Sequence, residues 1–153
     1  MDFHNLKLET FCHQTEDAKK VKKALVSLIP PGIDFAKRKD LGICEERVEG
    51  SFGNRILILS VNFKRQPDIR AVLSNIAAGL SPSDAKETLE YLDDHIEGTL
   101  FILRLDKQAA FNGEIKLGVQ DTIQLSGKVA AYPAKHEKAV KLMKGLWKTL
   151  LNG

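Results

Sequence analysis

Strand-like and helix-like segments follow one another along the whole chain without a long linker or an internal repeat, and this order limits the fold more than any other feature. Residues 3–13 alternate apolar and polar side chains, which predicts a strand with one buried face. Further strands are expected over residues 43–48 and 55–63, joined by a glycine-rich hairpin connection, and over residues 99–105 and 122–131. The run ILILSVNF in the second strand of the hairpin is the most apolar and predicts a central place in the sheet.

Four amphipathic helices are expected between and after these strands. Thr15 is the expected cap of the first helix, and Pro67 stands at the first helical position of the second. Ser81 is the expected cap of the third, which runs to about His95 and has an acidic outer face. The last helix occupies residues 134–150, with apolar side chains on one side and lysines on the other.

The order of elements, βαββααββα, predicts an α+β fold in which helices cover one face of a mainly antiparallel sheet, as a two-layer sandwich. With 153 residues, of which 43% are hydrophobic, the chain suffices for one core. We expect a single domain over residues 1–153 with the terminal helix, residues 134–151, docked on it. The aliphatic neighbours of Trp147 predict a core anchor and not a surface for stacking bases. The apolar side of that helix comprises Ala139, Leu142, Met143, Leu146, Trp147 and Leu150.

Location and redox state follow from simpler features. No eighteen apolar residues run together and nothing near Met1 has the pattern of a secretory signal, so we expect a cytoplasmic protein without a membrane partner. Cys12 and Cys44 lie too far apart for a CxxC motif, and two reduced thiols are expected. A disulfide between them is the alternative.

Charge is distributed unevenly, although the formal net charge is only +3. Residues 18–39 hold seven basic side chains against Asp34 alone, and residues 134–153 hold five lysines and one glutamate. Residues 81–97 are acidic, with six carboxylates opposed only by Lys86. This distribution predicts a polarised molecule.

No pattern in the sequence predicts catalysis. The cluster Asp93, Asp94 and His95 ends a helix with an acidic outer face, which favours solvated surface; a magnesium-dependent nuclease at this cluster is the weaker alternative. Cys12 and His13 point to opposite faces of a strand, so no metal site is expected. There is neither a nucleophile elbow nor a phosphate-binding loop. We therefore expect no enzyme, no catalytic residue and no cofactor.

The turn from Gly50 to Gly53 matches the GxxG loop of RNA-binding KH domains in form only, because a KH loop joins two helices and this one joins strands. The favoured interpretation is a glycine turn in which Phe52 folds over the edge of the core. Asn54 and Arg55 would remain available to a phosphate group.

The strand at residues 99–105 breaks abruptly into polar side chains, in the segment RLDKQAA from Arg104 to Ala110 followed by Gly113. With Thr15, Glu16 and Asp17 opening the first helix and the GxxGN segment at residues 50–54, it resembles a family of archaeal proteins that are predicted to bind RNA and to be exosome subunits. Arg55 departs from the family, which favours proline there. The resemblance implies a double-stranded-RNA-binding-domain-like fold, also found in ribosomal protein five of the large subunit.

The resemblance and the basic helices together predict a non-catalytic RNA-binding accessory protein that docks structured RNA through its phosphates, in RNA processing, the exosome or a ribosome-related assembly. This prediction requires the lysines of the first and last helices to share one surface. The alternative is a protein-interaction module, a homodimer or complex subunit, in which the RLDKQ segment and the acidic helix form the interface. The candidate RNA contacts are Lys19, Lys22, Lys23, Arg55, Arg104, Lys107, Gln108, Lys138, Lys141 and Lys144.

Overall fold

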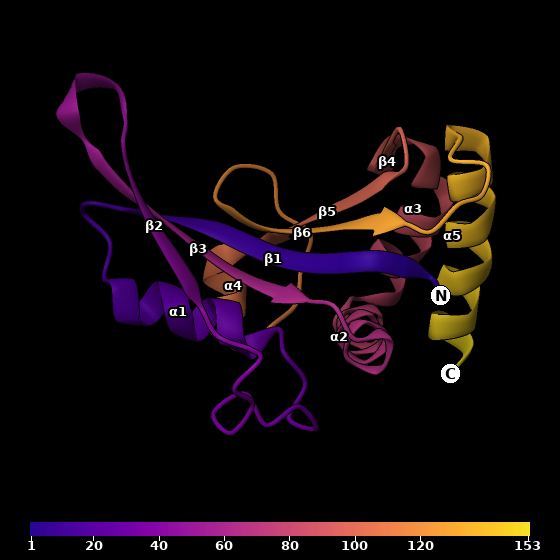
Figure 1. The fold of residues 1–153 in the computed structure, drawn as a ribbon, viewed down its shortest axis with the longest axis horizontal. Helices are drawn as coiled ribbons and strands as arrows, with labels where there is room; N and C mark the ends of the chain where they lie inside the picture. The colour runs from indigo at the N-terminus through magenta and orange to yellow at the C-terminus, as the bar shows by residue number, and fades with distance from the viewer.

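A six-stranded antiparallel sheet in the order β2-β3-β1-β6-β5-β4 organises the computed structural model, which describes residues 1–153 (Figure 1). The α+β fold expected from the sequence is confirmed. The strands are β1 (Phe3–His13), β2 (Cys44–Glu49), β3 (Arg55–Phe63), β4 (Ile96–Glu97), β5 (Leu100–Asp106) and β6 (Thr122–Val129). The helices are α1 (Ala18–Ser27), α2 (Gln66–Gly79), α3 (Pro82–Glu90), α4 (Lys107–Phe111) and α5 (His136–Asn152), with single 3-10 turns at Ser51–Gly53 and Leu92–His95.

The core lies between the sheet and the helices. Along β1 the buried side chains alternate with more exposed ones, as its period of two predicts. Leu8 pairs with Val61 on β3 and with Leu125 on β6, and all three are fully buried. The opposite face of the sheet carries no helix, and Phe11 is about half exposed there. The two middle strands are β1 and β6, so the apolar β3 is an interior strand but does not occupy the centre of the sheet.

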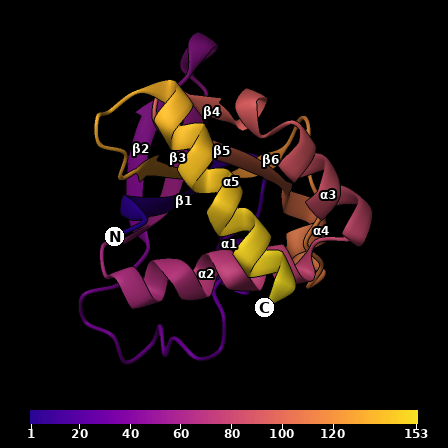
Figure 2. The same ribbon diagram turned by 90° about the vertical axis from the view of Figure 1, so that its right-hand side faces the viewer.

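Helix α5 closes one end of the molecule and crosses α2 (Figure 2). Trp147 is fully buried, donates its indole N–H to the Ala85 carbonyl at 3.0 Å, and lies 6.3 Å from the Phe101 ring, which confirms the predicted core anchor. The prediction that Leu142 belongs to the core is wrong, because 40% of this residue is exposed. No helix combines the length and the apolar character needed to cross a bilayer.

Four local expectations are corrected. Asp17, not Thr15, caps α1 by accepting the Lys19 backbone N–H at 3.0 Å. Ser81 does cap α3, but this helix ends at Glu90 and a 3-10 turn replaces its expected last turn. The polar segment after β5 is a helix, α4, and the short strand β4 was not foreseen. The expectation of two reduced thiols, by contrast, is confirmed: both cysteines are free, Cys12 buried and Cys44 exposed.

Candidate nucleic-acid interface

The two basic helices lie at opposite ends of the long axis of the molecule (Figure 1). Helix α1 packs on α4 and β1, whereas α5 packs on α2, α3 and the β4 region. The expectation that their lysines share one surface is therefore wrong. Periodicity predicts which side of its own helix a lysine occupies, but not where that helix docks on the sheet. The two ends must accordingly be considered as separate candidate surfaces.

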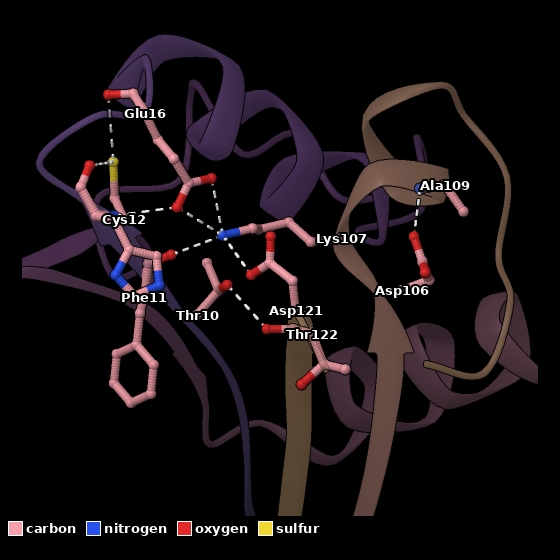
Figure 3. A network of polar contacts seen from close by, with 10 residues as sticks. Thr10, Phe11, Cys12, Glu16, Asp106, Lys107, Ala109, Asp121 and Thr122 are labelled. Atoms are coloured by element: carbon pink, nitrogen blue, oxygen red, sulfur yellow. Dashed lines mark hydrogen bonds and ion pairs between the residues drawn. The ribbon is translucent and has the colours of Figure 1, made fainter. Parts of the chain in front are cut away.

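Lys107, a predicted RNA contact, is buried and occupied by intramolecular partners. Its side chain is only 6% exposed, and its ammonium donates to the Phe11 carbonyl at 2.9 Å. The same nitrogen lies 3.0 Å from a Glu16 carboxylate oxygen and 2.8 Å from one of Asp121 (Figure 3). A cation with three anionic or carbonyl partners has no donor left to offer a phosphate, and this geometry argues against an RNA contact at Lys107.

This ammonium joins the two most distinctive motifs of the sequence, because Glu16 belongs to the first helix opening and Lys107 to the RLDKQ segment. Burial alone would lower the pKa of Lys107, but the hydrogen bonds to Asp121 and Glu16 outweigh it and raise that pKa. Burial alone would raise the pKa of Glu16, but the His13 backbone N–H and Lys107 lower it below its usual range. Asp106 completes the junction by capping α4 through the Ala109 backbone N–H at 2.8 Å. The motifs therefore hold α1 against α4.

The same junction contains the one grouping of metal-capable side chains, His13, Glu16 and Asp121, whose ligand atoms lie within 4.8 Å of one another. The Lys107 ammonium already contacts both carboxylates. A divalent cation would have to displace or repel this charge, so the donor set does not fit a metal.

Arg104 and Gln108 diverge although they are four residues apart. Arg104 is exposed on the uncovered face of the sheet, opposite Gln124 of β6. Gln108 is exposed on α4 and lines a cavity of about 230 Å³ beside α1, together with Lys20 and Phe111. Only Gln108 therefore joins the surface around α1.

The lysines of α1 divide between two neighbours. Lys20 and Lys23 lie over the ring of Phe111, 5.8 and 5.0 Å from its centroid, in cation–π contacts. Lys22 forms an ion pair with Glu45 of β2, and Lys19 has no carboxylate partner within 4.0 Å. The helix thus presents cations on both sides, and three of its four lysines are free of ion pairs.

Arg55 extends this basic surface onto the β2–β3 hairpin. Its backbone N–H donates to the Gln14 side chain at 3.4 Å, which ties the hairpin to the connection between β1 and α1. Arg47, which the sequence analysis did not select, lines the same groove of about 570 Å³ as Arg55 and Gln14. Neither arginine has an ion-pair partner, although Glu49 stands opposite Arg55 in the strand register. We call the region formed by Lys19, Lys20, Lys22, Lys23, Arg47, Arg55 and Gln108 the hairpin end.

At the other end, Lys138 and Lys141 line a shallow groove of about 380 Å³ with Arg70 of α2. Arg70 is paired with Asp2 at 3.1 Å, and Lys144 is exposed on the next turn of α5. We call the region formed by Arg70, Lys138, Lys141 and Lys144 the α5 end.

The basic run at residues 37–39 joins neither end. Arg38 binds Asp68 and Asp40, each at 2.7 Å, and Lys37 lies 3.7 Å from Asp34. Hydrogen bonding to Arg38 lowers the pKa of Asp40 to about 2. Part of the positive charge of residues 18–39 is therefore neutralised locally.

Comparison with known proteins identifies relatives along nearly the whole chain. A family model described as RNA binding matches residues 5–129. An RNA-binding protein of Pyrococcus abyssi is 38% identical over 143 residues, which cover 92% of this chain and 91% of that protein. The crystal structure of a DUF54 protein from Archaeoglobus fulgidus superposes with a TM-score of 0.82 at 27% identity, covering 94% of this chain and 99% of that chain.

A second DUF54 structure, from Methanothermobacter thermautotrophicus, has a TM-score of 0.75 at 30% identity and covers 96% of this chain and 99% of that chain. Both solved structures share the fold described above over almost the full length. The family match spans the sheet from β1 to the end of β6, including both motifs that meet at Lys107. The chain belongs to this archaeal RNA-binding protein family.

Proposed function

We propose that this protein binds structured RNA without cleaving it, and that the hairpin end is the surface that binds. The observation that carries the proposal is that three elements contribute unpaired cations at the same end of the molecule. Arg47 of β2 and Arg55 of β3 line one groove. Helix α1, which an ion pair links to β2, contributes further lysines. Lys19, Arg47 and Arg55 have no carboxylate within ion-pairing distance. Each such cation can replace a condensed counterion on a phosphate, and release of these counterions drives binding with little dependence on sequence.

The α5 end supports RNA binding less well. Its lysines come from a single helix, and its arginine is already paired with Asp2. Single-helix lysine stripes are common as solvated surface. Lys138, Lys141 and Lys144 are therefore secondary to Lys19, Lys23 and Arg55 in this proposal.

The absence of catalysis is part of the proposal. Two carboxylates that line the cavity beside α1, Glu16 and Asp121, are neutralised by Lys107 and so lack the free charge with which a nuclease holds magnesium. Asp93 pairs with His136 at 2.8 Å at the opposite end of the chain's long axis. RNA incubated with the protein and magnesium should stay intact, and cleavage that a chelator stops would contradict this part.

Action in the cytoplasm, within the exosome or a ribosome-related assembly, and kinship with the double-stranded-RNA-binding-domain-like fold are the finer parts of the proposal. The assembly and the fold kinship are supported by the resemblance of the motifs alone, and the cytoplasmic location by the pattern of apolar residues in the sequence. The rival function, a protein-interaction module or homodimer, is favoured by one observation: the uncovered sheet face, where Phe11 and Leu100 are 49% and 37% exposed.

Two matched charge reversals test the RNA surface. One variant carries Lys19→Glu, Lys23→Glu and Arg55→Glu, and the other Lys138→Glu, Lys141→Glu and Lys144→Glu, so both lose the same charge. We expect the first to weaken binding to an RNA hairpin by about 100-fold or more at low salt and to reduce the salt slope by about three. The second should change affinity far less. A reversed ranking would move the surface to the α5 end, and undetectable binding by the unmodified protein would favour the rival.

A further inference from the structure

Phe52 lies at the tip of the β2–β3 hairpin, which projects from one end of the molecule (Figure 1). Its relative exposure is 101%, so the ring touches nothing in the protein. Its backbone is in the left-handed region, with φ 66° and ψ 24°. The expectation that Phe52 folds over the edge of the core is therefore wrong.

Both features are unfavourable for the isolated chain. A bulky residue with positive φ is strained, and glycine, asparagine or aspartate would adopt this conformation more readily. A fully hydrated aromatic ring gains no burial to offset that strain. The ring also has no aromatic or cation–π partner, in contrast to Phe101 and Phe111. A hairpin turn alone does not require phenylalanine here, and a ligand for the ring would account for it.

The surroundings of Phe52 indicate what kind of ligand. Ser51, Gly53 and Asn54 are polar or small and all exposed, so no apolar rim surrounds the ring. A protein-binding hot spot needs such a rim to exclude water, whereas stacking on a nucleobase needs only one free ring face. Arg55 begins β3 directly after this turn, and Arg47 lines the groove below it.

We propose that Phe52 is a stacking platform for an unpaired nucleobase of the bound RNA, with Arg55 and Arg47 binding the flanking phosphates. This inference rests on the proposed function and makes the substrate class narrower. The hairpin end binds the phosphate backbone, and the tip selects RNA that offers a loop, bulge or single-stranded end. A uniform duplex, whose bases are stacked and paired, gives the ring nothing to stack on.

The test compares two RNAs of equal length, a fully paired duplex and a hairpin with 2-aminopurine in an unpaired loop, against four variants. Phe52→Ala should weaken binding to the loop RNA by about 5- to 150-fold, the range for loss of one stacked base, and change duplex binding less than about twofold. Phe52→Trp should retain loop binding and 2-aminopurine quenching, and Phe52→Leu should lose both. Tyr132→Ala, at another aromatic that is 92% exposed, is the matched control and should change neither affinity.

The outcomes separate this inference from the proposed function. If the unmodified protein binds neither RNA, the proposed function fails. If it binds both and Phe52→Ala changes neither affinity, the stacking site is overturned and the tip is left to a protein partner, while the charged surface stands. Equal loss for loop and duplex RNA, or full activity of Phe52→Leu, would also overturn stacking. Thermal unfolding of each variant is the control that checks whether its fold is unchanged.

Discussion

Both ends of the molecule carry a group of basic side chains, but the two groups are built differently. At the α5 end, cations lie on the outside of a long helix whose inner side is anchored by Trp147. At the hairpin end, cations come from several elements, and the aromatic at the hairpin tip, Phe52, is fully exposed to solvent. Trp147 stabilises the fold at the α5 end, whereas Phe52 at the hairpin end has no contact within the protein and is free for a ligand.

This contrast shows why charge alone does not identify a binding surface. A helix on the outside of a protein usually carries charges on its solvated face, and α5 needs no further explanation for its lysines. At the hairpin end a buried ion-pair junction fixes the position of α1, while the neighbouring cations other than Lys22 stay unpaired. Fixed positions together with free charges are what distinguish a preorganised surface.

The largest expected effect contrasts the two aromatic residues. Trp147→Ala should lower the free energy of unfolding by about 3–5 kcal/mol, because it empties a fully buried site and leaves the Ala85 carbonyl without its donor. Phe52→Ala should change it by less than about 0.5 kcal/mol, because the ring has no contact to lose. Urea denaturation followed by circular dichroism measures both. If the two variants lost similar free energy of unfolding, the contrast between the buried Trp147 and the exposed Phe52 would be contradicted.

The next effect concerns the Lys107 junction at the hairpin end. Lys107→Met should destabilise the fold by about 1–3 kcal/mol at neutral pH, because Glu16, whose side chain is 27% exposed, loses its hydrogen-bonded cation. Lys19→Met, at an exposed lysine of α1 without an ion pair, is the control and should be nearly neutral.

The pKa shifts of Glu16 and Lys107 predict how the loss of stability in Lys107→Met depends on pH. The pKa of Glu16 is lowered from its ordinary 4.5, so its contribution is complete above pH 4.5 and is lost as the pH falls through the lower folded value. The pKa of Lys107 is raised, so its contribution is complete below its ordinary 10.5 and is lost only as the pH rises through the higher folded value. As the pH falls below 4.5, the free energy of unfolding should therefore decrease less in Lys107→Met than in the unmodified protein. Parallel profiles would show that the junction does not titrate with folding.

The smallest effect concerns an exposed ion pair at the opposite end. The His136 ring lies 2.8 Å from Asp93, and hydrogen bonds to Asp93 and to the Gly98 carbonyl raise the pKa of His136 from its ordinary 6.5. This contribution is complete below pH 6.5 and is lost as the pH rises through the folded value. In NMR titrations, Asp93→Asn should return the His136 pKa toward 6.5, with little change in stability because the pair is exposed. Asp94→Asn, next in the chain, should leave it unchanged.

Much of the fold could be predicted because the spacing of apolar residues along a strand or helix directly indicates which side chains are buried. The alternation in β1 and the one-sided apolar pattern around Trp147 both predicted the observed core. Helix α4 could not be recognised by period, since it has only five residues and begins with a lysine whose burial depends on Glu16 and Asp121. Those partners come from distant parts of the chain, and their meeting is a property of the strand order.

The candidate surface was harder to predict for the same reason. Lys19, Lys23 and Arg55 were selected from the sequence and do lie at one end, whereas Lys138 lies at the other. Arg47 joins the candidate surface through its place on the groove, which no local pattern reports. The exposure of Phe52 was missed because an aromatic beside glycines is usually buried at the edge of a core, and here the hairpin extends beyond that core.

The position of β2 at the border of the sheet has a consequence for solubility. Its outer edge leaves backbone N–H and carbonyl groups unpaired, and such an edge can recruit a strand from another molecule and start aggregation. Four of its side chains are charged: Glu45, Glu46, Arg47 and Glu49. An incoming copy aligned with β2 would place several glutamates close to one another and would be repelled. Strand β2, which supports the projecting tip, therefore also discourages edge-to-edge pairing between the sheets of two molecules.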